Sequence, residues 1–289
     1  MGHFLKFFYQ SFLALRAIIF YLIMGLTILV GVSLVFLTWP LKFSWGRFLV
    51  IKTWSKLMLY TAKYICGLDF EIKGLENLRN PPFIILSKHQ SAWETIVFSG
   101  IFPPNCFVTK RELIFIPIFG WAFGISKHIP IDRKQGREAI RKISEMGTQR
   151  LKEGISIVLF PEGTRVKPYE NPEFHKGGAL LVKATGSKII CVAHNAGHCW
   201  RRQSFLKTPG KIRVVISEPM DTSGLSINEI NQLAHDWIER NMKKIEKELA
   251  IAQEQWEEDS KNNKIEVTED NVADVVSMMT GIPVNRIAQ

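Results

Sequence analysis

The sequence predicts an α/β fold: a largely parallel sheet with flanking helices, preceded by an N-terminal membrane-anchoring helical segment. Three features lead to this prediction. A long uncharged apolar run lies near the N-terminus, short β-branched runs follow after Gly67, and helical patterns separate several of those runs. Strands that alternate with helices are typical of a parallel sheet whose faces are covered by helices.

The apolar run extends over 25 residues, from Ala17 to Leu41, and contains no charge. As a helix it is about 37 Å long at 1.5 Å per residue, and the hydrocarbon core of a bilayer is about 30 Å thick. A secretory signal peptide has a shorter apolar region and a small-residue cleavage site, and no A-x-A-like site stands out here. We therefore expect the run to enter a membrane rather than to form the core helix of a soluble domain.

A second segment, "FLVIKTWSKLMLYTAKYICG", places Lys52, Lys56 and Lys63 at helical spacings of four and seven. One basic stripe on an apolar and aromatic helix is the pattern of a helix that lies in the membrane interface. Residues 1–66 are therefore predicted to be a membrane anchor, with one helix in the bilayer and one on its surface. Basic residues flank the apolar run on both sides, so a spanning helix and a re-entrant hairpin are both open.

The body of the chain, residues 67–258, is predicted to be the α/β domain. A helix with an apolar stripe is expected within 136–154, and a charged amphipathic helix within 226–258. Parallel sheets carry their sites at the carboxyl ends of the strands. Five strands are predicted from apolar runs, at 83–86, 106–109, 156–160, 189–193 and 212–216.

The net charge of +10 and the pI of about 9.4 indicate an anionic partner, such as nucleic acid, anionic lipid or a phosphorylated small molecule. The basic residues are scattered, and no zinc-finger or RNA-recognition signature is present, which argues against nucleic acid. The four cysteines form no CxxC pair. The neighbouring His194, His198 and Cys199 are therefore not predicted to bind a metal ion.

The stretch "SKHQSAWETI" follows a predicted strand and contains His89 five residues before Glu94. On its own the pair fits two interpretations: a catalytic histidine with its acid, or two polar residues at the start of an ordinary helix. Five positions of a regular helix turn by a net of about 140°, which would point the two side chains apart. A catalytic His89 must therefore lie in the loop and fold back over the first helical turn, with Ser91 as a cap.

Four blocks in a fixed order decide between these interpretations: "HQSAWE" (89–94), "KRELIFIPIFG…IPIDR" (110–133), "FPEGTR" (160–165) with "FHKGGA" (174–179), and "ICVAHNAG" (190–197). Through these blocks the chain resembles the glycerophospholipid acyltransferases over roughly residues 68–250. It is most similar to the bacterial 1-acylglycerol-3-phosphate acyltransferases. The resemblance implies that His89 and Glu94 form the catalytic pair.

The implied reaction moves a fatty acyl group from acyl-CoA or acyl-carrier protein to the 2-hydroxyl of lysophosphatidic acid, giving phosphatidic acid. His89 would take the hydroxyl proton as general base, and Glu94 would orient it, as an acid orients the histidine of serine hydrolases. The helix N-terminus would also present backbone amides to the developing oxyanion. No metal or cofactor is needed. The enzyme would work among membrane phospholipids at the cytoplasmic side of the cell inner membrane.

The substrate-binding residues implied by the resemblance are Glu162, Gly163, Thr164, Arg165, Arg133 and Lys110. Gly163 would let the backbone approach closely, and Arg165 would offer a two-pronged guanidinium to phosphate. Two alternatives stay open. One is an acyltransferase for another acceptor, such as glycerol-3-phosphate or a different lysolipid, and the other is a membrane-tethered lipid-binding protein without turnover.

The chain departs from the family at three positions. Lys88 stands where Asn usually precedes the histidine, Glu94 replaces the commoner Asp, and Cys191 stands where Pro is often found. Because of these departures, the resemblance does not decide which acceptor the enzyme uses. Residues 259–289 are predicted to be a polar linker and an extraneous tail that resembles the segment between the two ATPase modules of Clp-type unfoldases. No phosphate-binding loop accompanies this tail, so no ATPase activity is predicted.

Overall fold

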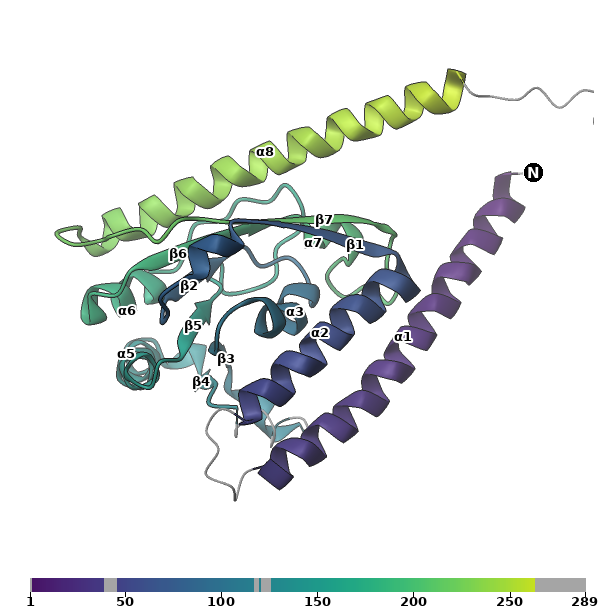
Figure 1. Cartoon of the computed structure of the whole chain (residues 1–289). Coiled ribbons are helices and arrows are strands. Elements are labelled where there is room, and N and C mark those ends of the chain that lie inside the picture. Colours follow the sequence, from purple (N-terminus) through teal and green to yellow (C-terminus); the bar gives the residue numbers. More distant parts are fainter. Residues whose placement is uncertain (1, 39–45, 117–119, 121–125, 263–289) are drawn as a thin grey trace, which may run out of the picture. The chain divides into compact units, whose positions relative to one another are not determined.

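The computed structural model describes residues 2–38, 46–116, 120 and 126–262 (Figure 1). Contacts divide the chain into two units, Met1–Ile245 and Glu246–Gln289. The described part of the second unit continues helix α8 (Ile227–Asn262). The tail predicted to be Clp-like lies outside the described residues.

A seven-stranded sheet with the order β1-β7-β6-β2-β5-β3-β4 forms the centre of the first unit. Neighbouring strands are parallel except for β6 and β7, so the prediction of a largely parallel sheet is confirmed. The strands are β1 (Leu68–Lys73), β2 (Ile84–Ser87), β3 (Asn105–Lys110), β4 (Ile129–Ile131), β5 (Ser156–Leu159), β6 (Ile189–His194) and β7 (Gly210–Ile216). Every residue of β2, β5 and β6 is buried, which explains why these strands read as continuous apolar runs.

Different helices cover the two faces of the sheet. Helices α2 (Gly46–Cys66) and α3 (Trp93–Ile101) share one apolar cluster with Ile85 of β2. On the other face, glycines of α5 (Arg137–Lys152) and α6 (Gly177–Thr185) lie directly against Ile157 and Leu86. Successive strand residues point to opposite faces, so the sheet is buried on both sides.

Four further helices in the described part of the chain are short. They are η1 (Leu75–Leu78), η2 (Arg111–Phe115), η3 (Arg133–Gln135) and α7 (Ala196–Cys199). Helix α8 buries Ile230, Ala234 and Ile238 at a spacing of four, as its predicted amphipathic pattern requires. Residues 259–262, which were predicted to begin a linker, continue this helix instead.

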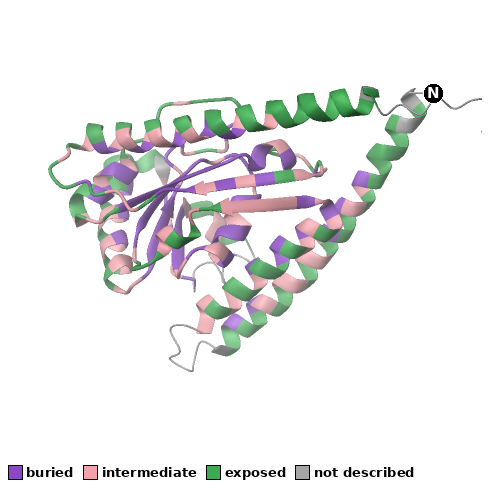
Figure 2. Ribbon diagram, turned by 45° about the horizontal axis from the view of Figure 1, so that its top comes forward, coloured by how far each residue is buried: buried purple, intermediate pink, exposed green. Residues whose placement is uncertain are grey.

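The N-terminal helices α1 (Gly2–Thr38) and α2 lie side by side (Figures 1 and 2). Trp54 Nε1 in α2 donates a hydrogen bond of 3.1 Å to Thr27 Oγ1 in α1. Gly67 follows α2 with φ of 69°, a left-handed conformation that commonly ends a helix. Much of α1 is exposed, and its stretch Lys6–Leu37 is long and apolar enough to cross a membrane. This helix is therefore a candidate membrane span.

Candidate active site

His89 lies in the loop between β2 and α3, at the carboxyl end of β2. Its Nδ1 atom is 2.9 Å from Oε1 of Glu94, which stands in the first turn of α3. Its ring stacks on the Phe160 ring, with 3.9 Å between centroids and 14° between planes. The predicted fold-back of His89 over the first helical turn is therefore confirmed.

The Glu94 side chain is fully buried and collects several donors. Besides His89, the backbone amides of Gln90 and Ser91 donate to Oε1, at 2.9 and 2.7 Å. Burial raises the pKa of Glu94, but His194 and the hydrogen-bonded His89 outweigh burial and hold this pKa below its ordinary value. Glu94 is therefore ionised at neutral pH.

Three backbone amides around the start of α3 donate to side chains of the same segment. Those of Gln90 and Ser91 donate to Glu94, and the amide of Trp93 donates to Ser91 Oγ at 3.1 Å. Ser91 thus contributes to capping, although the N-cap position itself belongs to Ala92. These three amides are therefore occupied by Glu94 and Ser91, and the presentation of other amides of the helix N-terminus to a developing oxyanion stays a prediction.

A cavity of about 560 Å³ opens beside His89. Its apolar wall includes residues of both N-terminal helices: Ile28, Val32, Val35, Ile51 and Trp54. Its polar lining includes Lys110, Gly163, Thr164 and Arg165, four of the residues predicted to bind substrate. Gly163 has φ of 70°, which is a conformation that glycine adopts without strain. The structure thus brings these four residues to one cavity with His89.

Glu162 and Arg133 differ from that group. Glu162 is 4% exposed and does not line the cavity; its Oε2 atom accepts a hydrogen bond of 2.7 Å from the His89 amide. The structure therefore does not support the predicted contact of Glu162 with substrate. Arg133 begins η3, and its side chain lies outside the described part of the structure.

Two further residues reach the site without having been predicted as part of it. Arg202 lines the cavity, and its Nη1 atom donates a hydrogen bond of 2.9 Å to Arg165 O. His194 Nε2 donates to Lys88 O at 2.8 Å and so supports the loop that carries His89. The basic pair that contains Arg202, close behind the block at 190–197, is the signal that was available in the sequence. Among the described residues, no group of three His, Cys, Asp or Glu side chains could hold a metal ion.

The fold and this histidine–carboxylate cavity agree with comparisons to known proteins. The acyltransferase family model matches residues 69–195. The chain is 37% identical over 236 residues to a 1-acyl-sn-glycerol-3-phosphate acyltransferase of Pseudomonas aeruginosa, covering 80% of this chain and 92% of that protein. The chain belongs to the acyltransferase family, and the resemblance inferred from the four sequence blocks is confirmed.

Two more distant similarities extend this finding. The chain is 28% identical over 202 residues to 1-acyl-sn-glycerol-3-phosphate acyltransferase alpha of Homo sapiens, covering 68% of this chain and 70% of that protein. Its fold matches the crystal structure of the 1-acyl-sn-glycerophosphate acyltransferase PlsC from Thermotoga maritima with a TM-score of 0.68. That match has 23% identity and covers 80% of this chain and 95% of the other. The relatives from Pseudomonas aeruginosa and Homo sapiens are named as acyltransferases, so the chain is an enzyme of this class.

Proposed function

We propose that the chain transfers a fatty acyl group from a thioester donor to the 2-hydroxyl of lysophosphatidic acid, which gives phosphatidic acid. The observation that carries this proposal is the His89–Glu94 pair beside a cavity that combines apolar walls with the Arg165 guanidinium. Such a cavity suits an acceptor with an acyl chain at one end and a phosphate at the other. The printed names of the relatives from Pseudomonas aeruginosa and Homo sapiens support the same acceptor.

His89 acts as the general base through Nε2, because Nδ1 is bound to Glu94. Ionised Glu94 fixes the tautomer of the ring and stabilises the imidazolium that forms. The acceptor oxygen attacks the thioester carbonyl carbon, an ester C–O bond forms, and the C–S bond breaks. The proton passes from the hydroxyl to His89 and then to the departing thiolate, so no covalent bond to the enzyme is required.

Arg165 and Arg202 bind the phosphate of the acceptor. Both line the cavity, and the hydrogen bond from Arg202 to Arg165 O links their positions. Within the described part of the chain, neither guanidinium has a carboxylate partner, so both can form charge-assisted hydrogen bonds to a dianion. Lys110 adds a third positive charge, and the Gly163–Thr164 backbone lets the phosphate approach closely. Arg133 stays a further candidate for this role.

The apolar wall holds the acyl chain, and part of that wall comes from the membrane anchor, residues 1–66. A substrate that lies in a bilayer can therefore enter the cavity without crossing water. We assign the catalytic domain to residues 67–258 and place it at the cytoplasmic side of the cell inner membrane, where acyl-CoA and acyl-carrier protein are available as donors.

The test uses purified full-length protein in detergent with both donor classes and a panel of acceptors. The panel contains lysophosphatidic acid, glycerol-3-phosphate and lysophosphatidylcholine, and products are identified by mass spectrometry. We expect phosphatidic acid from lysophosphatidic acid, and none above background with His89→Ala. A preference for another acceptor would refute the acceptor assignment. Binding without turnover would indicate the lipid-binding alternative, and near-normal turnover by His89→Ala would refute the mechanism.

A further inference from the structure

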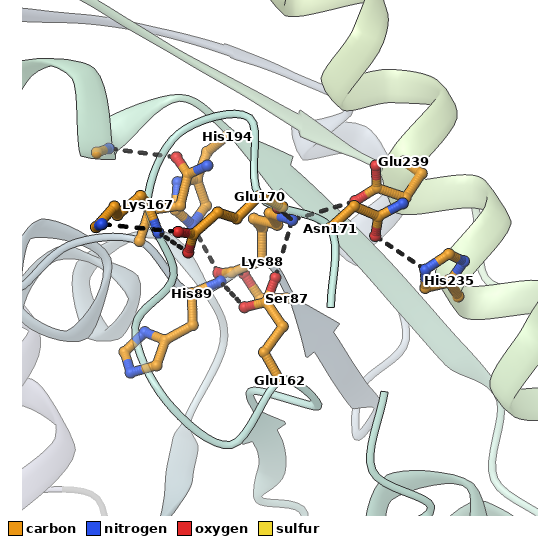
Figure 3. A network of polar contacts seen from close by, with 12 residues as sticks. Ser87, Lys88, His89, Glu162, Lys167, Glu170, Asn171, His194, His235 and Glu239 are labelled. Carbon is orange, nitrogen blue, oxygen red and sulfur yellow. Dashed lines mark hydrogen bonds and ion pairs between the residues drawn. The ribbon is translucent and has the colours of Figure 1, made fainter. Parts of the chain in front are cut away.

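Lys88, directly before the catalytic histidine, is a buried lysine that the mechanism does not use. It is 1% exposed and stands among the largest fully buried side chains of the described residues. Its Nζ atom donates to Glu170 O at 2.9 Å and to Glu239 Oε1 at 3.1 Å, and it lies 3.0 Å from Glu162 Oε1 (Figure 3). The ammonium thus makes two hydrogen bonds and forms ion pairs with two carboxylates, which offset the cost of its burial.

Glu162 connects this ammonium to the backbone of the catalytic residue. Its Oε1 atom forms the ion pair with Lys88, and its Oε2 atom accepts the hydrogen bond from the His89 amide. The Oε1 contact is an ion pair without well-directed hydrogen-bond geometry. A carboxylate buried this deeply requires a cation, and Lys88 provides it.

The part of helix α8 that belongs to the first unit contacts the same network. Two of its residues, Asn231 and His235, contact the loop that follows the FPEGTR motif, and Glu239, four positions further along the helix, contacts Lys88. Asn231 Nδ2 donates to Phe174 O at 3.0 Å, and His235 Nε2 is 2.9 Å from Asn171 Oδ1. Figure 3 shows Lys88 between this part of α8 and the loop that carries His89. One side of α8 therefore fastens the loop, and Glu239 extends the contact to Lys88.

We propose that Lys88 is a positioning residue for the acyl transfer, because its ammonium, held by Glu239 of α8, keeps the Glu162 carboxylate against the His89 amide. The inference rests on the proposed function, in which His89 is the general base. It assigns a role in catalysis to Lys88 and Glu239, neither of which touches substrate. It also explains why Glu162 is buried away from the cavity within a motif expected to bind substrate.

Lys88→Met removes the charge while keeping most of the volume. We expect kcat to fall about ten- to hundredfold, since a displaced base loses alignment with the hydroxyl. KM for both substrates should stay within about threefold, because the cavity lining is intact. Arg240→Gln, an exposed neighbour of Glu239 on α8, is the matched control and should keep kcat within about twofold. A folded Lys88→Met with wild-type kcat would overturn the proposal.

A double-mutant cycle shows whether Lys88 acts through Glu162. Once Glu162→Gln has removed the carboxylate, loss of Lys88 should cost little. The Lys88→Met/Glu162→Gln variant should therefore have a kcat within about threefold of Glu162→Gln alone. A further drop of about tenfold or more would refute the route through Glu162. This comparison does not need the Lys88→Met single variant, so it remains decisive if that variant does not fold.

The pH dependence of kcat distinguishes a positioning role of Lys88 from a role in packing alone. Burial raises the pKa of Glu162 to about 7 against the opposing effect of Lys88. The charged and titratable groups around Glu162 are Lys88, His89 and Glu94, with Glu239 beyond Lys88. Without Lys88 the pKa of Glu162 rises further, so the acidic limb of kcat should move up by about one pH unit or more. A lysine that only fills space would leave this limb in place.

Hydrogen exchange gives a readout that does not depend on turnover. The His89 amide donates to Glu162 in the wild type, and in Lys88→Met its exchange should be about tenfold faster, as for the loss of one hydrogen bond. Unchanged exchange in the folded variant would overturn the positioning role. If wild-type protein fails to acylate lysophosphatidic acid while exchange responds as expected, the proposed function fails and the structural link from Lys88 to His89 stands.

Discussion

His89 is held by contacts from two separate segments of the chain, the first turn of α3 and the loop that follows β5. Its ring contacts Glu94 in α3 and Phe160 after β5, its amide donates to Glu162, and its carbonyl oxygen accepts from the Val166 amide at 2.8 Å. Each contact fixes different atoms of the residue. The imidazole is therefore oriented before substrate arrives, which is the condition for efficient proton transfer.

Glu94→Gln tests the role of the ionised partner. An amide can still receive one hydrogen bond, but it cannot stabilise the imidazolium and no longer fixes the tautomer of His89. We expect kcat to fall by about 10²–10⁴ with little change in KM. Glu112→Gln, an exposed carboxylate in η2, is the control. Equal kcat in wild type and Glu94→Gln would show that Glu94 is only a structural acceptor.

Arg202→Gln tests the phosphate site that the sequence motifs did not reveal. Arg202 is exposed, so we expect Arg202→Gln to raise KM for lysophosphatidic acid by about three- to tenfold. Arg165→Gln should have a larger effect, a loss of about tenfold to several hundredfold in kcat/KM. Both effects should shrink for monoacylglycerol, which lacks the phosphate. The neighbouring Arg201 is exposed and does not line the cavity, so Arg201→Gln is a matched control. Equal losses with and without the phosphate would refute the assignment.

At the residue scale, the sequence predicted the parts of the site that lie within short blocks. His89, Glu94 and Arg165 each belong to a motif whose spacing is visible in the chain. Arg202 lies outside the four blocks and reaches the site only through tertiary folding. His194 lies within the fourth block, but the block gave no sign of its contact with Lys88. The orientation of Glu162 was not predictable either, because it depends on a buried lysine that stands 74 positions earlier.

At the element scale, the predicted strands correspond to β2, β3, β5, β6 and β7, and the two missed strands have physical reasons. β1, "LDFEIK", alternates apolar and charged residues and is only partly buried, so a search for continuous apolar runs passes over it. β4 has three residues and pairs with β3 at the edge of the sheet. The antiparallel direction of β7 against β6 depends on how the connecting segment folds, and the apolar periodicity of a strand contains no information about its direction.

Lys207 is one of the contacts between helix α1 and the α/β domain. This buried lysine lies 3.6 Å from the Tyr21 ring centroid and 4.4 Å from that of Trp200, and it donates to Phe205 O at 3.0 Å. Burial lowers the pKa of Lys207 to about 8, so the amine is mostly charged at neutral pH. The contact joins an aromatic residue of the anchor to the segment after α7.

Lys207→Met should therefore loosen this attachment. The loss of cation–π attraction, about 0.5–2 kcal/mol, should lower the Tm in detergent by a few degrees, at about 2–4 °C per kcal/mol. Lys211→Met, a change at an exposed lysine, is the control. A higher Tm in Lys207→Met would mean that the cost of burying the charge exceeds the attraction of the rings.

At the scale of the whole molecule, the tail predicted to be Clp-like is expected to be dispensable. All four sequence blocks end by Gly197, and every residue of the cavity and of the Lys88 network lies within the first unit. Removal of residues 264–289 should leave kcat and KM within about twofold of the wild type. The measurement compares purified full-length and shortened protein at equal detergent concentration. A large loss of activity in a folded truncation would make the tail part of the enzyme.

The proposed membrane anchor, residues 1–66, requires a test that leaves the fold intact. Deletion of residues 1–66 is unsuitable, because Phe20, Leu59 and Ala62 belong to the apolar cluster that they share with the sheet. α1 also carries Leu22, Leu26 and Val30 at a spacing of four, with 61%, 66% and 60% exposure. Lysines at these positions would put positive charges on the exposed apolar side of α1 without disturbing the buried core.

Leu22→Lys/Leu26→Lys should weaken membrane insertion while preserving catalysis in detergent. Each lysine near the centre of an inserted helix costs about 2.5–3.5 kcal/mol, so two make insertion strongly unfavourable. The measurement is the fraction of protein that stays in membranes after alkaline carbonate extraction, with activity assayed after solubilisation. Ile140→Lys/Ile251→Lys places the same charges on exposed apolar positions outside the anchor, at 36% and 44% exposure, and should stay membrane-bound. If both double variants resist extraction equally, this side of α1 does not enter the hydrocarbon, and the anchor is held at the interface by α2.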